Sequence, residues 1–288
     1  MRVVELSDHP SLLLLQAQQR RRAEASAEER RFRTALTRHR KRLDRAVRAR
    51  DQARARHRWW TWLRTSLTVR RERRLAPAQP RPRQLPSDRE AIATAGIQGE
   101  QLVELRLGDT LGDEWVLLRG YRNNRGEIDH LLLGPRGLFA IEGKHRNATV
   151  YCAADRWRYV KYDKYNNPVE QGEMTDKKGR SPSQQLNQPA DQLEGFLRSR
   201  GHPVRIQRVV LLTHDRSRIG SCTDPTVHVT TSTTLITRLI GRSPASVADD
   251  ERAQIERLIV RDHDHHATRR TGQRTRARSP GHPGPRVT

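Results

Sequence analysis

Two short apolar runs separated by a turn signal form the most informative pattern in the chain. The runs cover residues 127–133 and 138–142, and the tetrapeptide GPRG lies between them at 134–137. Short apolar runs bounded by Gly and Pro favour strands. The pattern therefore predicts a β-hairpin, although Pro135 suits a four-residue turn better than a two-residue loop.

The register of this hairpin decides which side chains meet. If Gly134 pairs with Gly137, Asp129 lies directly opposite Glu142, and Lys144 points to the same face. A shift of one residue would place Asp129 and Glu142 on opposite faces. Since opposed carboxylates repel each other, we expect a cation between them, either Lys144 or a divalent metal ion.

Apolar residues occupy both faces of the predicted hairpin. The carboxylate face carries Leu131, Leu133, Leu138 and Ala140, and the opposite face carries Ile128, Leu132, Phe139 and Ile141. Strands that are apolar on both faces are usually central and covered on both sides. A solvated salt bridge on an edge hairpin fits this pattern poorly, because charges in a covered strand need a partner or a metal.

Two helical patterns flank the hairpin in the sequence. The segment GIQGE at 96–100 precedes leucines at helical spacing, which predicts a helix that presents Glu100 near its start. By itself this is a weak signal, because the helix macrodipole favours a Glu in the first turn of many structural helices. The segment SPSQQ at 181–185 opens another helix, in which Gln185 would point an amide at the same site.

The rest of the chain predicts extensions around one globular domain. Residues 12–75 lack Pro and Gly and favour a long helix, and four prolines between 76 and 88 indicate a stiff linker. Residues 209–212 predict a buried strand, and residues 226–240 predict a strand followed by a short helix. The composition from about residue 267 predicts disorder.

Charge is distributed unevenly along the chain. The net charge is +23, and residues 1–90 hold 25 basic and 10 acidic side chains, against 21 and 17 in residues 91–240. A nearly balanced domain beside a cationic flank makes nucleic acid the natural partner, although a positive surface also suits anionic lipid. No apolar run approaches the length of a membrane span, so no integral span is expected.

Two other candidate sites carry weaker signals. Cys152 and Cys222 are far apart and lack CxxC spacing, so neither zinc binding nor a disulfide framework is expected, and the composition suits a reducing cytoplasm. The run DHDHH at 262–266 is a possible metal site. We expect it instead to be a polar segment that enters the disordered tail.

Tryptophan is concentrated near the end of the predicted long helix. Trp59, Trp60 and Trp62 are three of the five tryptophans in the chain. The plainer interpretation is a helix end that packs on the globular domain. The alternatives are a membrane-surface anchor and stacking on nucleic acid bases.

Taken in order, these landmarks resemble the nuclease-related domain, NERD. The resemblance covers roughly residues 91–214 and is carried by Glu100 in GxxGE, Asp129 in EIDH, Glu142 and Lys144 in ExK, Trp157 after the hairpin, and Gln185 in PxxQ. It implies membership of the PD-(D/E)xK nuclease superfamily. The implied fold is α/β (α+β) and restriction-endonuclease-like, with a mixed central sheet flanked by helices.

Two positions depart from the family pattern. Gly143 stands where an apolar strand former is usual, and Gly inside a strand weakens it or marks a bulge. Ser181 stands where Asn is usual, and the segment NPVEQ at 167–171 offers a competing motif. Gln185 is favoured over Gln171, because an apolar helical pattern follows it.

The resemblance also implies a chemistry, namely phosphodiester hydrolysis with Mg²⁺ or Mn²⁺. Asp129 and Glu142 would supply oxygen ligands, and Glu100 would bind the metal through water or hold a second ion. Lys144 would orient the attacking water or offset charge on the phosphate. Gln185 would steady Lys144 or the nucleophile.

These expectations combine into one organisation. It consists of a basic helical arm at 1–75, a Pro-rich linker at 76–90, a NERD-like domain at 91–240, a short helical extension at 241–266 and a disordered basic tail at 267–288. The expected function is a cytoplasmic, metal-dependent nuclease or nuclease-related DNA-processing protein whose arm holds nucleic acid. One alternative is a catalytically inactive nucleic-acid-binding module. The other is an interaction or membrane-peripheral protein that binds a protein partner or a membrane through its N-terminal helix.

Overall fold

The chain folds into two compact units. The computed structural model describes residues 1–80, 86–231, 233–244 and 246–278. One unit combines Met1–Leu12 with Ala93–Thr288, and the other is Leu13–Ile92. The second unit is therefore an insertion, by sequence, into the first. The first unit is larger than the predicted domain at 91–240, because it includes the N-terminal strand and the C-terminal helix.

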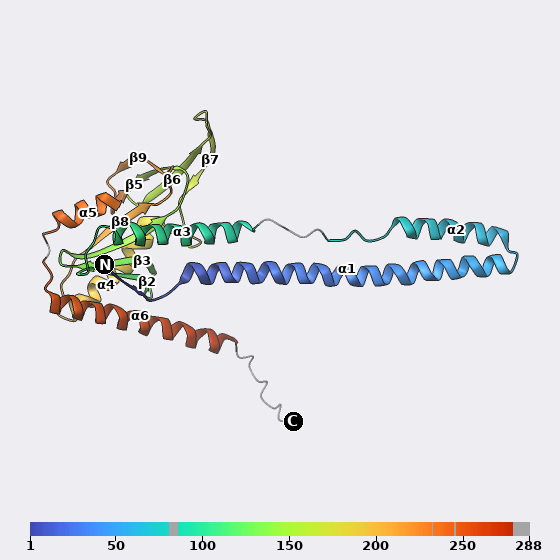
Figure 1. Ribbon diagram of the computed structural model, residues 1–288, viewed down its shortest axis with the longest axis horizontal. Coiled ribbons are helices and arrows are strands. Elements are labelled where there is room, and N and C mark those ends of the chain that lie inside the picture. The colour runs from blue at the N-terminus through green and yellow to red at the C-terminus, as the bar shows by residue number, and fades with distance from the viewer. Residues whose placement is uncertain (81–85, 232, 245, 279–288) are drawn as a thin grey trace, which may run out of the picture. The chain divides into compact units, whose positions relative to one another are not determined.

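A six-stranded mixed sheet forms the centre of the first unit (Figure 1). Its order is β1 (Arg2–Glu5), β2 (Val116–Arg122), β3 (Glu127–Gly134), β4 (Gly137–Lys144), β8 (Ile206–Leu212) and β10 (His228–Thr230). Strands β2, β3 and β4 are antiparallel, whereas β1, β8 and β10 each pair in parallel with a neighbour. The predicted mixed sheet is confirmed, as is the buried strand at 209–212.

Helices cover both faces of this sheet, as the strands' two apolar faces require. Helices α4 (Pro182–Ser199) and α6 (Asp249–Arg278) pack on the face of Leu131 and Leu133 through Leu186, Leu193, Ile255 and Ile259. Helices α3 (Asp88–Gly108) and α5 (Thr233–Arg242) pack with Leu132 and Phe139 through Val103, Leu107, Ile236 and Ile240. The α/β fold class predicted from the sequence is confirmed.

The β3–β4 hairpin has the predicted register. Gly134 pairs with Gly137, and the ladder continues to His130 and Ile141. It stops one step before Asp129 and Glu142. The β2–β3 ladder also skips Asp129, whose counterpart Gly120 has a left-handed φ of +69°. Asp129 therefore lies at a local break in the sheet.

Because of this break, Ile128 does not lie on the face that the sequence predicted. The alternation of the strand placed Ile128 on the face of Leu132. It instead packs with Leu131 and Tyr121 in the core under α4 and α6. The reason is that Ile128 pairs with Tyr121, beyond the left-handed turn at Gly120.

A second sheet has the order β7 (Pro168–Glu173), β6 (Arg156–Tyr162), β5 (Thr149–Ala153), β9 (Arg218–Thr223). Strands β5 and β9 are parallel, and their register partners Cys152 and Cys222 form a disulfide with Cα atoms 4.5 Å apart. The expectation of no disulfide is wrong, because adjacent strands join cysteines that are 70 residues apart. The cysteines thus no longer argue for a reducing compartment, and a cytoplasmic location stays a prediction.

The DHDHH run lies within helix α6 and packs on the central sheet. Tyr121 Oη donates a hydrogen bond to Asp262 Oδ2 over 2.5 Å, and the Arg122 N–H donates to His263 Nδ1 over 3.1 Å. Both side chains are buried. The expectation of a polar entry into a disordered tail is therefore wrong here. Residues 267–278 continue the helix, and the remainder of the predicted tail lies outside the described residues.

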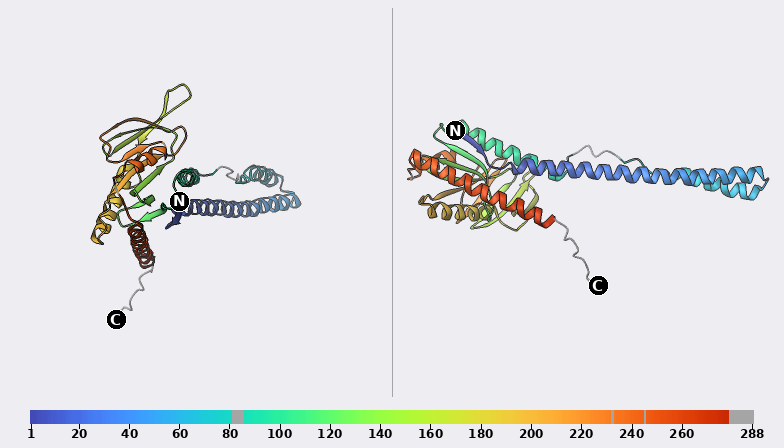
Figure 2. Two further views of the ribbon diagram at one scale, coloured as in Figure 1. Left: turned by 60° about the vertical axis from the view of Figure 1, so that its left-hand side comes forward. Right: turned by 90° about the horizontal axis from the view of Figure 1, so that it is seen from below.

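The second unit is a helical hairpin, seen also in Figure 2. Instead of one helix over residues 12–75, α1 (His9–Ala55) and α2 (Trp59–Arg74) are separated at His57, which has a φ of +54°. Glu72 Oε2 lies 3.8 Å from both His39 and Arg42, so α2 runs back along α1. Within the described residues, no helix combines the length and apolar content that crossing a bilayer requires.

The tryptophan cluster lies at the start of α2. Trp59, Trp60 and Trp62 are 59%, 64% and 40% exposed. The interpretation in which this helix end packs on the globular domain stays a prediction. Their exposure means that α1 does not provide their packing surface.

Candidate functional site

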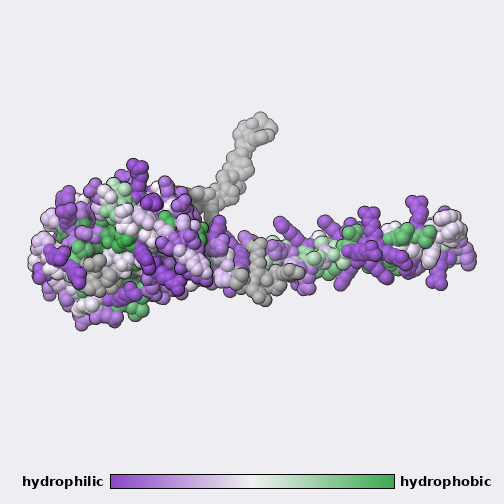
Figure 3. All heavy atoms as spheres, turned by 90° about the horizontal axis from the view of Figure 1, so that it is seen from above, coloured by the Kyte–Doolittle hydropathy of each residue, from purple (hydrophilic) through white to green (hydrophobic). Residues whose placement is uncertain are grey.

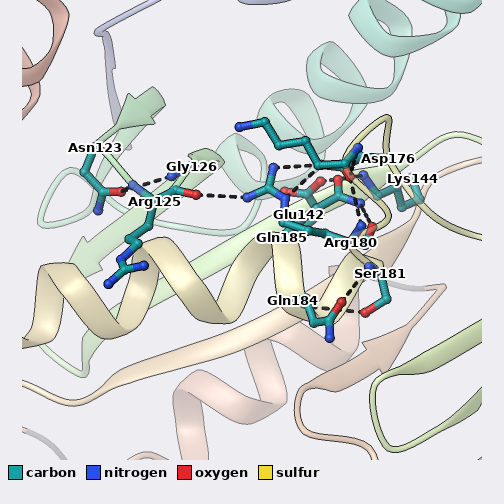
Figure 4. Close-up of polar contacts among 11 residues, drawn as sticks. Asn123, Arg125, Gly126, Glu142, Lys144, Asp176, Arg180, Ser181, Gln184 and Gln185 are labelled. Atoms are coloured by element: carbon teal, nitrogen blue, oxygen red, sulfur yellow. Dashed lines mark hydrogen bonds and ion pairs between the residues drawn. The ribbon is translucent and has the colours of Figure 1, made fainter.

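The site is built around the end of the central strand β4. Glu142 is buried, and its Oε1 lies 2.5 Å from Lys144 Nζ (Figure 4). The two residues are two apart on one strand, so their side chains leave the same face. Burial alone would lower the pKa of Lys144, but the attraction of Glu142 and Asp129 raises it above its usual value. Lys144 is therefore held in its charged form.

Asp129 reaches the same place from strand β3. Its Oδ2 accepts a hydrogen bond of 2.9 Å from the Gly143 N–H. Burial, followed by repulsion from Glu142, raises the pKa of Asp129 well above its ordinary value. The two carboxylates thus act on each other as the register predicted, and an added cation would stabilise the charged form of Asp129.

Gly143 does not interrupt the strand. It pairs regularly with Leu211 of β8, so it marks no bulge in the described strand. A Cβ atom added here would contact only Asp129 Oδ2, at an ordinary distance of 3.8 Å. The contribution of Gly143 to the site is its backbone N–H, which any residue other than proline supplies.

Helix α4 brings Gln185 to Lys144. Gln185 Oε1 accepts a hydrogen bond of 3.1 Å from Lys144 Nζ, and its Nε2 donates to the Arg180 carbonyl over 2.8 Å. Ser181 begins the helix as the N-cap of a capping box, so serine fulfils a structural role at the position where the family usually has Asn. The competing Gln171 is exposed on β7 and pairs with Val160 of β6.

An ion pair that the sequence did not reveal supports the segment that leads into the N-terminus of α4. Arg180 Nη2 lies 2.8 Å from Asp176 Oδ2, and its Nη1 donates to the Arg125 carbonyl over 2.9 Å (Figure 4). Asp176 also contributes to the raised pKa of Lys144. Both residues lie in a polar loop without a recognisable motif. The only available signal was their opposite charges four residues apart.

Helix α3 places Glu100 in its interior. The helix begins at Asp88, so Glu100 does not lie near the start as predicted, and the macrodipole explanation does not apply to it. The preceding Gly99 faces Thr213 and His145, and a Cβ atom there would lie 3.0 Å from Thr213 Oγ1 and 3.2 Å from His145 Cβ. Glycine in GxxGE therefore lets the helix approach the ends of β4 and β8.

Burial and a neighbouring arginine have opposite effects on the pKa of Glu100. Its Oε2 lies 3.6 Å from Arg119 Nη2, yet burial outweighs this attraction and raises the pKa of Glu100 to about 7. Glu100 also contributes to the raised pKa of Asp129. Among the described residues, no three His, Cys, Asp or Glu side chains converge as a preformed metal cage.

The donor set of the strand pair fits a small, hard cation. Asp129 and Glu142 offer carboxylate oxygens from two central strands, and Mg²⁺ and Mn²⁺ prefer such ligands. Burial, followed by repulsion from Glu142, outweighs the attraction of Lys144 and raises the pKa of Asp129, so a bound cation would offset the cost of charging this carboxyl. The structure thus brings together Asp129, Glu142, Lys144 and Gln185, with Glu100 close enough to influence Asp129.

Comparison with known families identifies one match. Residues 95–213 match the family model of the nuclease-related domain, NERD. The match includes the four central strands from β2 to β8 and all five predicted site residues, and it excludes the helical hairpin. Comparison with curated proteins and with solved structures gives no match. Residues 95–213 are therefore the part of this chain that is similar to the nuclease-related domain family, NERD.

Proposed function

We propose that this protein is a metal-dependent nuclease that hydrolyses phosphodiester bonds, with DNA as the favoured substrate. The observation that carries the proposal is the pair Asp129 and Glu142 beside a charged Lys144. Hydrolysis of a phosphodiester needs oxygen ligands for a cation and positive charge near the phosphorus. The three side chains supply both requirements.

Each residue has a distinct task in this proposal. Asp129 and Glu142 would hold Mg²⁺ or Mn²⁺, which when bound polarises a phosphate oxygen and lowers the pKa of a bound water. Lys144 keeps its proton, so its Nζ donates a hydrogen bond to the phosphate or to the attacking water and does not act as a base. Gln185 fixes the direction of that donor by accepting its second hydrogen bond.

Glu100 would support the cation from the other side of the strand pair. With a pKa of about 7, it changes charge in the range where nucleases work. In its charged form it would accept hydrogen bonds from water around the cation or bind a second ion. Arg119 holds the side chain in place through its 3.6 Å contact.

Cleavage assays on the full chain test this proposal. The protein would be incubated with plasmid DNA, single-stranded DNA and RNA in Mg²⁺, Mn²⁺ or EDTA. We expect cleavage that requires metal and is lost in Asp129→Asn. Asp113→Asn is the matched control, because Asp113 is fully exposed and distant in sequence from the strand pair.

Two results would contradict the proposal. Equal cleavage by the wild type and Asp129→Asn would mean that the activity does not depend on the site that contains Asp129. Metal and DNA binding without cleavage of any substrate would favour the alternative of an inactive nucleic-acid-binding module.

A further inference from the structure

Helix α2 presents its apolar side chains outward. Its protected stripe against α1 consists of the small or polar residues Thr61, Thr65, Ser66 and Glu72, with Val69 as the only large aliphatic side chain. Trp59, Trp60, Leu63 and Leu67 lie about half a turn away and are 59%, 64%, 41% and 58% exposed. We define these four residues as the outer stripe. A helix that served only to pack on α1 would show the reverse arrangement.

The surroundings of the outer stripe are strongly cationic. Residues 52–71 contain six arginines and no acidic residue. Arg64, Arg70 and Arg71 are exposed on the same helix. An anionic partner is therefore favoured. A second copy of this hairpin is disfavoured, because two arginine-rich surfaces would meet without acidic counterparts.

The chemistry of the outer stripe favours lipid over nucleic acid. Leu63 and Leu67 offer no stacking surface and no hydrogen bond to a base, but they match acyl chains. The rings of Trp59 and Trp60 lie 3.9 Å apart, so each covers part of the surface that a base would need for stacking. Tryptophan side chains favour the boundary between lipid and water, where arginines extend their charges to the headgroups.

We propose that α2 binds the surface of anionic lipid membranes. The helix lies along the interface, with the outer stripe inserted among the acyl chains and Arg64, Arg70 and Arg71 at the headgroups. Figure 3 shows apolar patches among hydrophilic side chains along the helical hairpin. This attachment needs no spanning helix, and it is independent of the nuclease proposal.

The intrinsic fluorescence of the full chain tests this proposal. Trp115 and Trp157 are only 4% and 3% exposed, so a spectral change reports mainly on the tryptophans of α2. The probes are vesicles of phosphatidylcholine with phosphatidylglycerol, vesicles of phosphatidylcholine alone, and a single-stranded oligonucleotide. We expect a blue shift and co-flotation with the anionic vesicles, and a much weaker response to the neutral ones.

Matched variants distinguish vesicle binding through the outer stripe from nonspecific binding through other exposed apolar side chains. The test variant combines Trp60→Gln, Leu63→Gln and Leu67→Gln. The control combines Ile92→Gln, Leu105→Gln and Val169→Gln, at positions that are 72%, 65% and 59% exposed elsewhere in the chain. Burying one large apolar side chain is worth about tenfold in affinity, so the three substitutions together should cost on the order of 1000-fold in vesicle binding. The control should bind as the wild type does.

Three outcomes would overturn the proposal. The first is unchanged vesicle binding by the test variant when circular dichroism shows equal helix content. The second is a response to the oligonucleotide without a response to vesicles, which would assign the stripe to nucleic acid. The third is self-association without lipid that the test variant abolishes, which would assign it to a second copy.

Discussion

The amide oxygen of Gln185 lies 3.1 Å from the ammonium nitrogen of Lys144, which joins the first turn of α4 to the end of β4. Gln185→Ala removes this contact, but Lys144 keeps its pairing with Glu142. A hydrogen bond to a charged group is worth about 1.5–3 kcal/mol, so we expect cleavage to slow by about 10- to 100-fold with unchanged metal affinity. Single-turnover cleavage and calorimetry measure the two quantities.

Gln171→Ala is the control for this variant, because Gln171 is exposed in the competing motif. It should leave both quantities unchanged. A parallel loss of rate and metal affinity in Gln185→Ala would instead mean that Gln185 maintains the shape of the metal site.

Asp129 should make stability depend on pH and metal. Its raised folded-state pKa means that the metal-free fold loses stability as pH rises from the ordinary carboxyl pKa of about 4 through the folded value. Asp129→Asn removes this loss, so it should be more stable than the wild type at about pH 8 in EDTA and similar below about pH 4. Urea unfolding measures both. Mg²⁺ should stabilise the wild type more than the variant, and equal stabilisation would argue against Asp129 as a ligand.

Glu100 should make the metal affinity of the protein change near neutral pH. Because its pKa is raised to about 7, the charged form grows as pH rises through that value. We expect metal affinity in the wild type to rise over this range and to be flatter in Glu100→Gln. Glu104→Gln is the matched control, since Glu104 lies on the same helix and also contacts Arg119, at 3.1 Å. Equal flattening in both variants would trace the effect to Arg119.

Gly99 and Gly96 should respond oppositely to alanine, although both lie in α3. At Gly99 a Cβ atom meets Thr213 and His145, so Gly99→Ala should lower the free energy of unfolding by about 1–3 kcal/mol through overpacking. At Gly96 nothing lies within 4 Å. Gly96→Ala should therefore raise the free energy of unfolding by up to about 1 kcal/mol, from helix propensity. Similar effects of the two substitutions in urea unfolding would contradict the close approach of α3.

The Cys152–Cys222 disulfide should stabilise the second sheet. It closes a loop of 70 residues, so Cys222→Ser should cost about 2–4 kcal/mol under non-reducing conditions. A reductant should abolish the difference between the variant and the wild type. Labelling of free thiols in the denatured, unreduced wild type would show that the bond does not form.

The central hairpin was predictable because its determinants are local. The GPRG tetrapeptide marks the turn, and the alternation of apolar residues fixes the register, so the meeting of Asp129 with Glu142 follows from residues that are close in sequence. Gln185 was also predictable, because the capping signal at Ser181 and the apolar pattern of the helix lie next to it.

Features that depend on distant pairing were not predictable. Strand β1 is only four residues long, and its partner β2 lies beyond the whole helical hairpin. The cysteines become neighbours only when β5 and β9 align. Asp262 looked like part of a solvated run, because the sequence does not show that Tyr121 donates to it. The start of α3 at Asp88 was missed for a different reason: the local marker was overlooked, since Ser87 and Glu90 have the spacing of a capping box and the Glu90 N–H donates to Ser87 Oγ over 3.3 Å.

The insertion of the helical hairpin after β1 has a consequence for synthesis. Residues 2–5 are made before the helical hairpin, but Arg2 pairs with Val116, so β1 cannot complete the sheet until the entire hairpin and strand β2 have been made. Contacts that join such distant residues form slowly, because a long loop must close first. During translation β1 therefore stays unpaired until β2 has been made, and until the two strands align the outer edge of β2 is open to pairing with another chain.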